Sequence, residues 1–123
     1  MNLINLTPHE VVVFSQDGIT VLGKIAPSGV VARVAATRKE LGVIPISSDA
    51  AAVLRGDIGA AIPVYGVEYG AIENLPPSER GVIYITSALV RQAVPNRRDV
   101  VSPGELVRDA KGQPVGCKGF DGN

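Results

Sequence analysis

Two adjacent arginines are the residues of this sequence best suited to binding chemistry. Arg97 and Arg98 follow Pro95 in the segment NRRD and precede a carboxylate, Asp99. A guanidinium offers a planar fork of hydrogen-bond donors and keeps its charge, so such a loop suits phosphate or carboxylate groups. Three further arginines could join this cluster in the folded chain: Arg33, Arg91 and Arg108.

A plainer interpretation of the same cluster stays open. Asp99 and Asp109 could pair with arginines at the surface, where ion pairs contribute little net stability. The role of Arg33 also has two interpretations, because Arg33 is the one charge in the apolar stretch Val30–Ala36. It could face solvent from a half-exposed strand, or it could contact a ligand.

Catalytic sets are hard to assemble from this composition. His9 is the only histidine and Cys117 the only cysteine, so neither a zinc motif nor an internal disulfide is available. The sequence Thr7-Pro8-His9 favours a turn in which Thr7 bonds to the backbone. Cys117 lies in a late strand flanked by glycines, with no activating base nearby in the sequence, which favours a small buried thiol. The glycines match neither the Walker nor the dinucleotide pattern.

The length, net charge and hydrophobic pattern of the chain argue against other classes of partner. Its 123 residues predict a single domain, residues 1–123. Twelve basic and twelve acidic residues cancel, so no global field favours polymeric nucleic acid or a membrane surface. The N-terminus lacks signal-peptide architecture and no apolar run reaches membrane-spanning length, so we expect a cytoplasmic protein.

The elements around the arginines can be predicted from local signals. The residues Val82–Thr86 are mostly β-branched and predict a buried strand. Ser87 is a good N-cap for a helix over Ala88–Ala93, which Pro95 ends. This strand and helix should therefore present the arginine loop.

The rest of the chain predicts short strands and turns. Residues 3–6, 11–14, 19–25 and 30–36 form an expected antiparallel meander, with Asp17-Gly18 as a hairpin turn. Residues 37–42 make a charged link, 43–46 a short strand and 50–54 a brief helix. Extended segments follow around Ile62, Val64, Val67 and Ile72, and 106–109 and 114–120 form a hairpin. The expected fold is α+β, mostly β, with an antiparallel sheet core and one or two short helices.

Six segments form an ordered series across nearly the whole chain: NLTPHEVVVF, APSGVVARV, YGAIENLP, VIYITSALV, NRRDVVSPGELVRD and AKGQPVGCKGF. This series resembles a group of small phage and bacterial proteins that begin with NLTPH. Within that group the chain is similar to the first type of Thoeris anti-defence sponge proteins.

The resemblance implies a binding protein without enzymatic activity and without a cofactor or metal. Such sponges sequester cyclic ADP-ribose isomers, the glycocyclic forms, in the cytoplasm of the infected bacterial host, and some relatives also hold cyclic di- or trinucleotides. Capture blocks Thoeris or CBASS immune signalling. The resemblance also implies a homo-oligomer, and a chain this small favours a ligand site enclosed between subunits.

The resemblance also assigns roles to particular residues. Arg98 and Arg33 would bind phosphate, Tyr69 would stack on adenine, and Asn74 or Asn96 would read the base edge. Arg91, Arg97 and Asp99 complete the candidate set. Two other functions stay open: a hydrolase of a nucleotide-sugar signal that uses Asp99 or Glu68 as base, and a phage structural or assembly module.

Overall fold

The structure is a computed structural model that describes residues 1–46, 55 and 60–123. This described part is mostly β with one short helix, as the sequence predicts. The chain divides into two compact units, Met1–Val34 with Ala71–Asn123 and, separately, Ala35–Gly70. The elements are, in order, β1 (Asn2–Asn5), β2 (Val11–Phe14), β3 (Val21–Ile25), β4 (Arg33–Ile46), β5 (Ala60–Glu73), β6 (Val82–Ile85), α2 (Ala88–Ala93), β7 (Val100–Pro103), β8 (Leu106–Arg108), β9 (Pro114–Cys117) and β10 (Phe120–Gly122).

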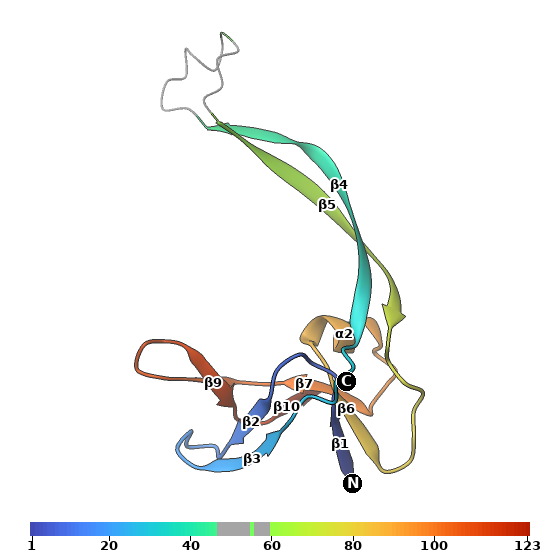
Figure 1. Ribbon diagram of the computed structural model, residues 1–123, viewed down its shortest axis with the longest axis vertical. Coiled ribbons are helices and arrows are strands. Elements are labelled where there is room, and N and C mark those ends of the chain that lie inside the picture. The colour runs from blue at the N-terminus through green and yellow to red at the C-terminus, as the bar shows by residue number, and fades with distance from the viewer. Residues whose placement is uncertain (47–54, 56–59) are drawn as a thin grey trace. The chain divides into compact units, whose positions relative to one another are not determined.

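The first sheet has the strand order β1-β6-β7-β10 (Figure 1). β1 runs parallel to β6 and β6 parallel to β7, whereas β10 is antiparallel to β7. The carboxyl ends of the three parallel strands, at Asn5, Ile85 and Pro103, therefore lie at one edge of the sheet. This sheet is therefore mixed, and its parallel pairs add to the antiparallel pairing that the sequence predicted.

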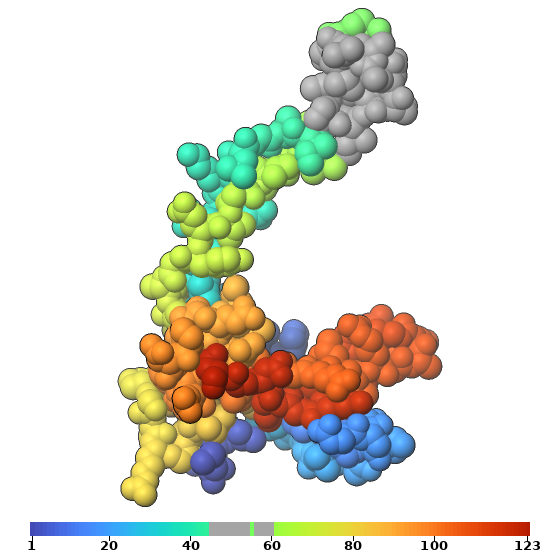
Figure 2. Space-filling view, turned by 180° about the vertical axis from the view of Figure 1, so that it is seen from behind, coloured from blue at the N-terminus to red at the C-terminus, as the bar shows by residue number. Residues whose placement is uncertain are grey.

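The second sheet has the order β3-β2-β9-β8 and is built from two hairpins. Both hairpins were predicted, and Figure 2 shows them side by side, β2–β3 in blue and β8–β9 in orange to red. They join in parallel where Val13 faces Cys117. A Cβ added at Gly116 would lie 2.5 Å from the Phe14 ring and 2.6 Å from the Val12 carbonyl oxygen, so β9 can approach β2 only with glycine there.

The helix α2 covers one face of the first sheet. Ser87 caps it as predicted, because its hydroxyl accepts a hydrogen bond from the Val90 amide at 3.3 Å. Val90 is 1% exposed and belongs to the larger core, which lies on the helix side: Leu6, Ala32, Val82, Tyr84, Val90 and Val100. The smaller core contains Val11, Ile85 and Cys117. Because Tyr84 and Ile85 are consecutive in a strand, the two cores lie on opposite faces of β6.

The NLTPH segment is a turn held by the side chain of Asn5, which is 1% exposed. Its amide nitrogen donates to the carbonyl oxygens of His9 (2.8 Å) and Ile25 (3.0 Å). Its amide oxygen accepts from the backbone N–H of Thr7 (2.9 Å) and from the Thr7 hydroxyl (2.6 Å). The Thr7 hydroxyl also reaches the His9 carbonyl oxygen at 3.0 Å, so the predicted Thr7 turn is confirmed.

β4 and β5 pair only with each other, as a ribbon of two strands of fourteen residues each (Figure 1). The prediction of a third meander strand over residues 30–36 is wrong, because the Ala32 amide bonds to the Leu6 carbonyl oxygen and β4 begins only at Arg33. The predicted link over 37–42 is also wrong: β4 continues through these charged residues, whose side chains are exposed. The predicted helix over 50–54 lies outside the described residues.

Candidate functional site

Arg97 is held by two partners within its own unit. Its Nε and one terminal nitrogen donate to the two carboxylate oxygens of Asp99 at 2.8 and 2.9 Å, and the same terminal nitrogen donates to the Pro76 carbonyl oxygen at 3.0 Å. The hydrogen bond from Arg97 holds the pKa of Asp99 below its usual value, while burial opposes the shift; the same bond raises the pKa of Arg97. This pair is the ion-paired loop that the plainer interpretation of the sequence describes.

The remaining arginines of the predicted cluster do not converge. Arg91 donates to the Ser102 hydroxyl at 2.9 Å, and Arg108 donates to the Gly112 carbonyl oxygen at 2.9 Å. Asp109 has no arginine partner among the described residues, and its carboxylate accepts the amides of Lys111 and Gln113 in its own turn. Arg98 is exposed and has no partner among the described residues, so it is the arginine of the loop that is available to a ligand.

A pocket of about 430 Å³ brings together two residues that the sequence nominated separately, Arg33 and Asn74. We call it the Arg33 pocket; it is lined by Gly29, Val30, Val31, Arg33, Glu73 and Asn74. Arg33 begins β4 and Glu73 ends β5, so strand pairing brings them to one place. The Asn74 amide donates to the Val31 carbonyl oxygen at 3.2 Å, and Asn74 has a φ of 62°, a conformation that asparagine tolerates.

The Arg33 pocket combines three kinds of polar group. Arg33 is exposed and, within the described residues, has no hydrogen-bond or ion-pair partner. Glu73 supplies a carboxylate, and the Asn74 amide keeps its oxygen free of any bond to the described protein atoms. A guanidinium, a carboxylate and a primary amide suit a phosphate, the hydroxyls of a sugar and the edge of a base, respectively.

The predicted stacking residue belongs to the other unit. Tyr69 lies on β5 within Ala35–Gly70 and is 59% exposed. Tyr65, on the same strand face, is 41% exposed and carries the Arg38 guanidinium 4.4 Å from its ring centre. Neither tyrosine fills a core. Asn96, the second candidate for base reading, is exposed in the arginine loop.

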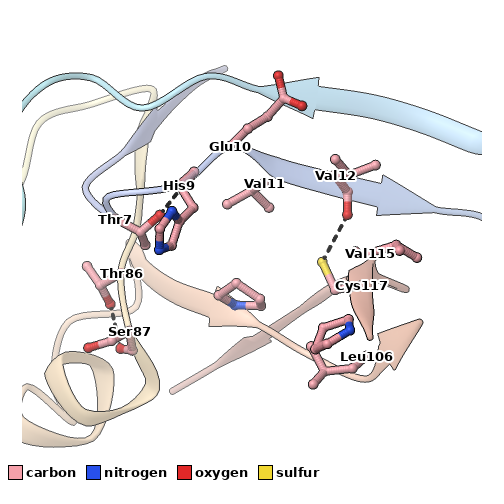
Figure 3. A pocket seen from close by; sticks show the side chains of 13 residues that line it. Thr7, His9, Glu10, Val11, Val12, Thr86, Ser87, Leu106, Val115 and Cys117 are labelled. Carbon is pink, nitrogen blue, oxygen red and sulfur yellow. Dashed lines mark hydrogen bonds between the residues drawn. The ribbon is translucent and has the colours of Figure 1, made fainter. Parts of the chain in front are cut away.

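Sequence analysis missed a second pocket, also of about 430 Å³, at the carboxyl ends of β1, β6 and β7. Figure 3 shows polar side chains at one end, from Thr7, His9, Thr86 and Ser87, and apolar walls at the other. Open sheets bind ligands at this edge. The sequence gives only a weak signal for this pocket. Thr7 comes near Thr86 through the pairing of β1 with β6, and these strands are about eighty residues apart in the chain.

The nucleophiles of this strand-end pocket already have structural roles. The Ser87 hydroxyl caps α2, and the Cys117 thiol, 1% exposed, donates to the Val12 carbonyl oxygen at 3.6 Å (Figure 3). This confirms Cys117 as a buried thiol. In the described part of the chain, no three His, Cys, Asp or Glu side chains gather where they could hold a metal ion. No helix in that part is long and apolar enough to cross a membrane.

Comparison with known proteins adds no relative. No family model matches the chain, and no curated protein and no solved structure matches it either. The function therefore has to be inferred from the site geometry and from the motifs of the sequence.

Proposed function

We propose that the protein binds a cyclic ADP-ribose isomer, such as glycocyclic ADP-ribose, and sequesters it without cleaving it. The observation that carries this proposal is the Arg33 pocket, an open surface pocket where Arg33, Glu73 and Asn74 lie together although they come from two distant segments. The ligand has a pyrophosphate, two riboses and an adenine, and these three side chains offer one suitable partner for each kind of group.

Arg98 supports the same proposal as a second phosphate-binding residue. Its neighbour Arg97 is fixed by Asp99 and Pro76, so the backbone that carries Arg98 is held in place while its own side chain stays available. A loop fixed in this way loses less conformational freedom when it binds a ligand.

Hydrolysis by Asp99 is disfavoured by the same ion pair. A carboxylate whose pKa is lowered is a weaker base, and both oxygens of Asp99 already accept hydrogen bonds from Arg97. Glu68, the other proposed base, lies on β5 in the Ala35–Gly70 unit, whereas the Arg33 pocket lies in the other.

The biological setting of this proposal comes from the resemblance. A phage protein that captures such a signal in the cytoplasm of the infected bacterium would block Thoeris signalling. Capture of cyclic di- or trinucleotides would extend the block to CBASS. Sequestration of this kind needs tight binding and slow release, and it needs no cofactor.

The test is calorimetric titration with glycocyclic ADP-ribose. The complex is then heated to release the ligand, which is identified by mass spectrometry. We expect tight binding and recovery of the intact molecule. Arg33→Ala and Arg98→Ala should each weaken binding about 10- to 100-fold, because a lost charge-assisted hydrogen bond is worth about 1.5–3 kcal/mol. Arg80→Ala, an exposed arginine outside the pocket, is the matched control and should bind as the wild type does.

Three outcomes would contradict the proposal. A cleaved product would make the protein an enzyme. Unchanged affinity in both Arg33→Ala and Arg98→Ala would mean that the ligand binds elsewhere, for example in the strand-end pocket. No binding at all would favour a structural or assembly role.

A further inference from the structure

The strand-end pocket has mostly apolar walls and lies within one unit of the chain. All of its lining residues belong to the unit formed by Met1–Val34 and Ala71–Asn123. Leu106 and Val115 are 48% and 41% exposed, so apolar surface is open to a ligand there. A pocket of about 430 Å³ with apolar walls and a few polar groups is typical of a small-molecule site. The walls include Val12, Leu106, Val115, Pro103 and Pro114.

The charges around this pocket favour an uncharged ligand. None of the described residues that line it is a lysine or an arginine, and Glu10 supplies the one carboxylate among them. A phosphate or carboxylate ligand would therefore lose water without gaining a cationic partner. Figure 3 shows the Glu10 carboxylate pointing away from Thr86 and Ser87, so a cationic head at that end would gain no anionic partner either.

The polar end of the pocket offers both an acceptor and donors of hydrogen bonds. The Thr7 hydroxyl gives its proton to the Asn5 amide oxygen or to the His9 carbonyl oxygen, so it offers a ligand only its lone pairs. The Ser87 hydroxyl accepts from the Val90 amide, and its own proton has no acceptor among the described residues. The His9 ring has no partner among them either and, when neutral, carries one donor and one acceptor nitrogen. A hydroxyl group, which both donates and accepts, complements this set.

We propose that the strand-end pocket binds an uncharged, apolar molecule with a single hydroxyl group, such as an alkylphenol. The ligand hydroxyl donates to the Thr7 oxygen and accepts from Ser87 or His9, while the ring and the alkyl chain pack against the apolar walls. This pocket shares no lining residue with the Arg33 pocket. The inference is therefore independent of the cyclic ADP-ribose proposal.

The experiment is an NMR titration of the isotope-labelled protein with para-propylphenol. We expect saturable shifts in the amide signals of Val12 and Cys117 and in the ring-proton signals of His9, all with one dissociation constant. His9 is the only histidine, so its ring signals are identified without further assignment. The amide signal of Asn74, in the Arg33 pocket, should not move.

Two analogues of the same shape test the head group. In para-propylanisole a methyl group replaces the hydroxyl proton, so this molecule is more apolar but cannot donate to Thr7, and para-propylbenzoate is an anion. Each analogue should bind at least about fivefold more weakly than para-propylphenol, because the first loses a hydrogen bond and the second has no cationic partner. Simple apolar capture predicts the reverse order for the anisole, because the anisole is the more apolar molecule.

A variant of the wall tests the location. Val115→Lys places a charge in the apolar wall and should weaken the binding of para-propylphenol at least about tenfold. Val21→Lys is the matched control, because Val21 lies in the same sheet, outside the pocket, and is 44% exposed against 41% for Val115. It should bind as the wild type does. Unchanged amide signals in the first sheet show that both variants are folded.

Three results would overturn this inference. The first is the absence of saturable shifts with para-propylphenol. The second is equal or tighter binding of either analogue, which would mean that the hydroxyl is not recognised. The third is an unchanged affinity in Val115→Lys, which would mean that the ligand lies elsewhere.

Discussion

Asn5 shows how much one buried polar side chain can organise. It joins the end of β1 to the start of β2 and to the end of β3 through four hydrogen bonds, and all of its amide groups are used. Asn5 and Thr7 thus explain why the segment NLTPH folds as it does. In this chain NLTPH is therefore a folding motif.

Replacing Asn5 by alanine should be costly. The Asn5→Ala variant removes the side-chain donor to the Ile25 carbonyl oxygen and the acceptor of the Thr7 amide, so we expect a loss of about 2–4 kcal/mol in the free energy of unfolding. Urea denaturation measures this loss. Asn96→Ala is the control, because Asn96 is exposed and should change stability by less than about 0.5 kcal/mol. Equal stability of the two variants would show that the Asn5 bonds contribute little.

At the scale of elements, the sequence predicts the turns and the helix start from local signals, but it does not predict which distant strands pair. Asp17-Gly18 and Ser87 act on neighbouring residues, so the β2–β3 turn and the start of α2 could be predicted. The parallel pairing of β1 with β6 depends on residues about eighty positions apart, which no local pattern records. The continuous β4 was hidden because its charged residues, Arg38 to Glu40, are typical of a loop.

The residues of the candidate site also fall into those that local signals predict and those that only the fold brings together. Arg98 was nominated by its type and by its place after Pro95, and the structure leaves it exposed. The association of Arg33 with Asn74 depends on the pairing of β4 with β5, and Glu73 carried no signal of its own in the sequence. The hydrogen bond from Arg97 to the Pro76 carbonyl oxygen could not be predicted from the sequence, because it joins two segments that only the fold brings together.

The arginine loop should respond to acid through Asp99. Its pKa is lowered in the folded protein from the ordinary 3.8, so its ion pair stabilises the fold above that pH and the contribution is lost as the pH falls below it. Asp99→Asn should lower the free energy of unfolding at pH 7 by about 1–2 kcal/mol. Denaturation at a series of pH values should show this difference from the wild type shrinking below pH 3.8. A constant difference would contradict the assignment.

At the scale of the whole molecule, the described core residues and the candidate site belong to one of the two units of the chain. Both cores, the Arg33 pocket and Arg98 lie in the unit formed by Met1–Val34 and Ala71–Asn123. The described residues of the Ala35–Gly70 unit expose apolar side chains and contribute no member to either core cluster. The first unit should therefore fold by itself.

Replacing Ala35–Gly70 by a short Gly-Ser linker tests this division. A short linker suffices, because a Cβ added at Gly70 would lie only 3.7 Å from the Ala35 carbonyl oxygen. We expect the free energy of unfolding of the remaining unit to change by less than about 1 kcal/mol, since no core residue is removed. Chemical denaturation measures this, and a chain that no longer unfolds cooperatively would contradict it.

The position of Cys117 has a practical consequence for measuring capture rates. It is the only thiol of the chain, it is 1% exposed, and it faces the Val12 carbonyl oxygen between β2 and β9. Maleimide reagents react with accessible thiolates, so the native protein should stay unlabelled while folded. A fluorophore could then be attached at a single cysteine introduced beside the Arg33 pocket, with the native cysteine left in place. Ligand capture could be followed in real time by stopped-flow fluorescence in an otherwise unaltered protein.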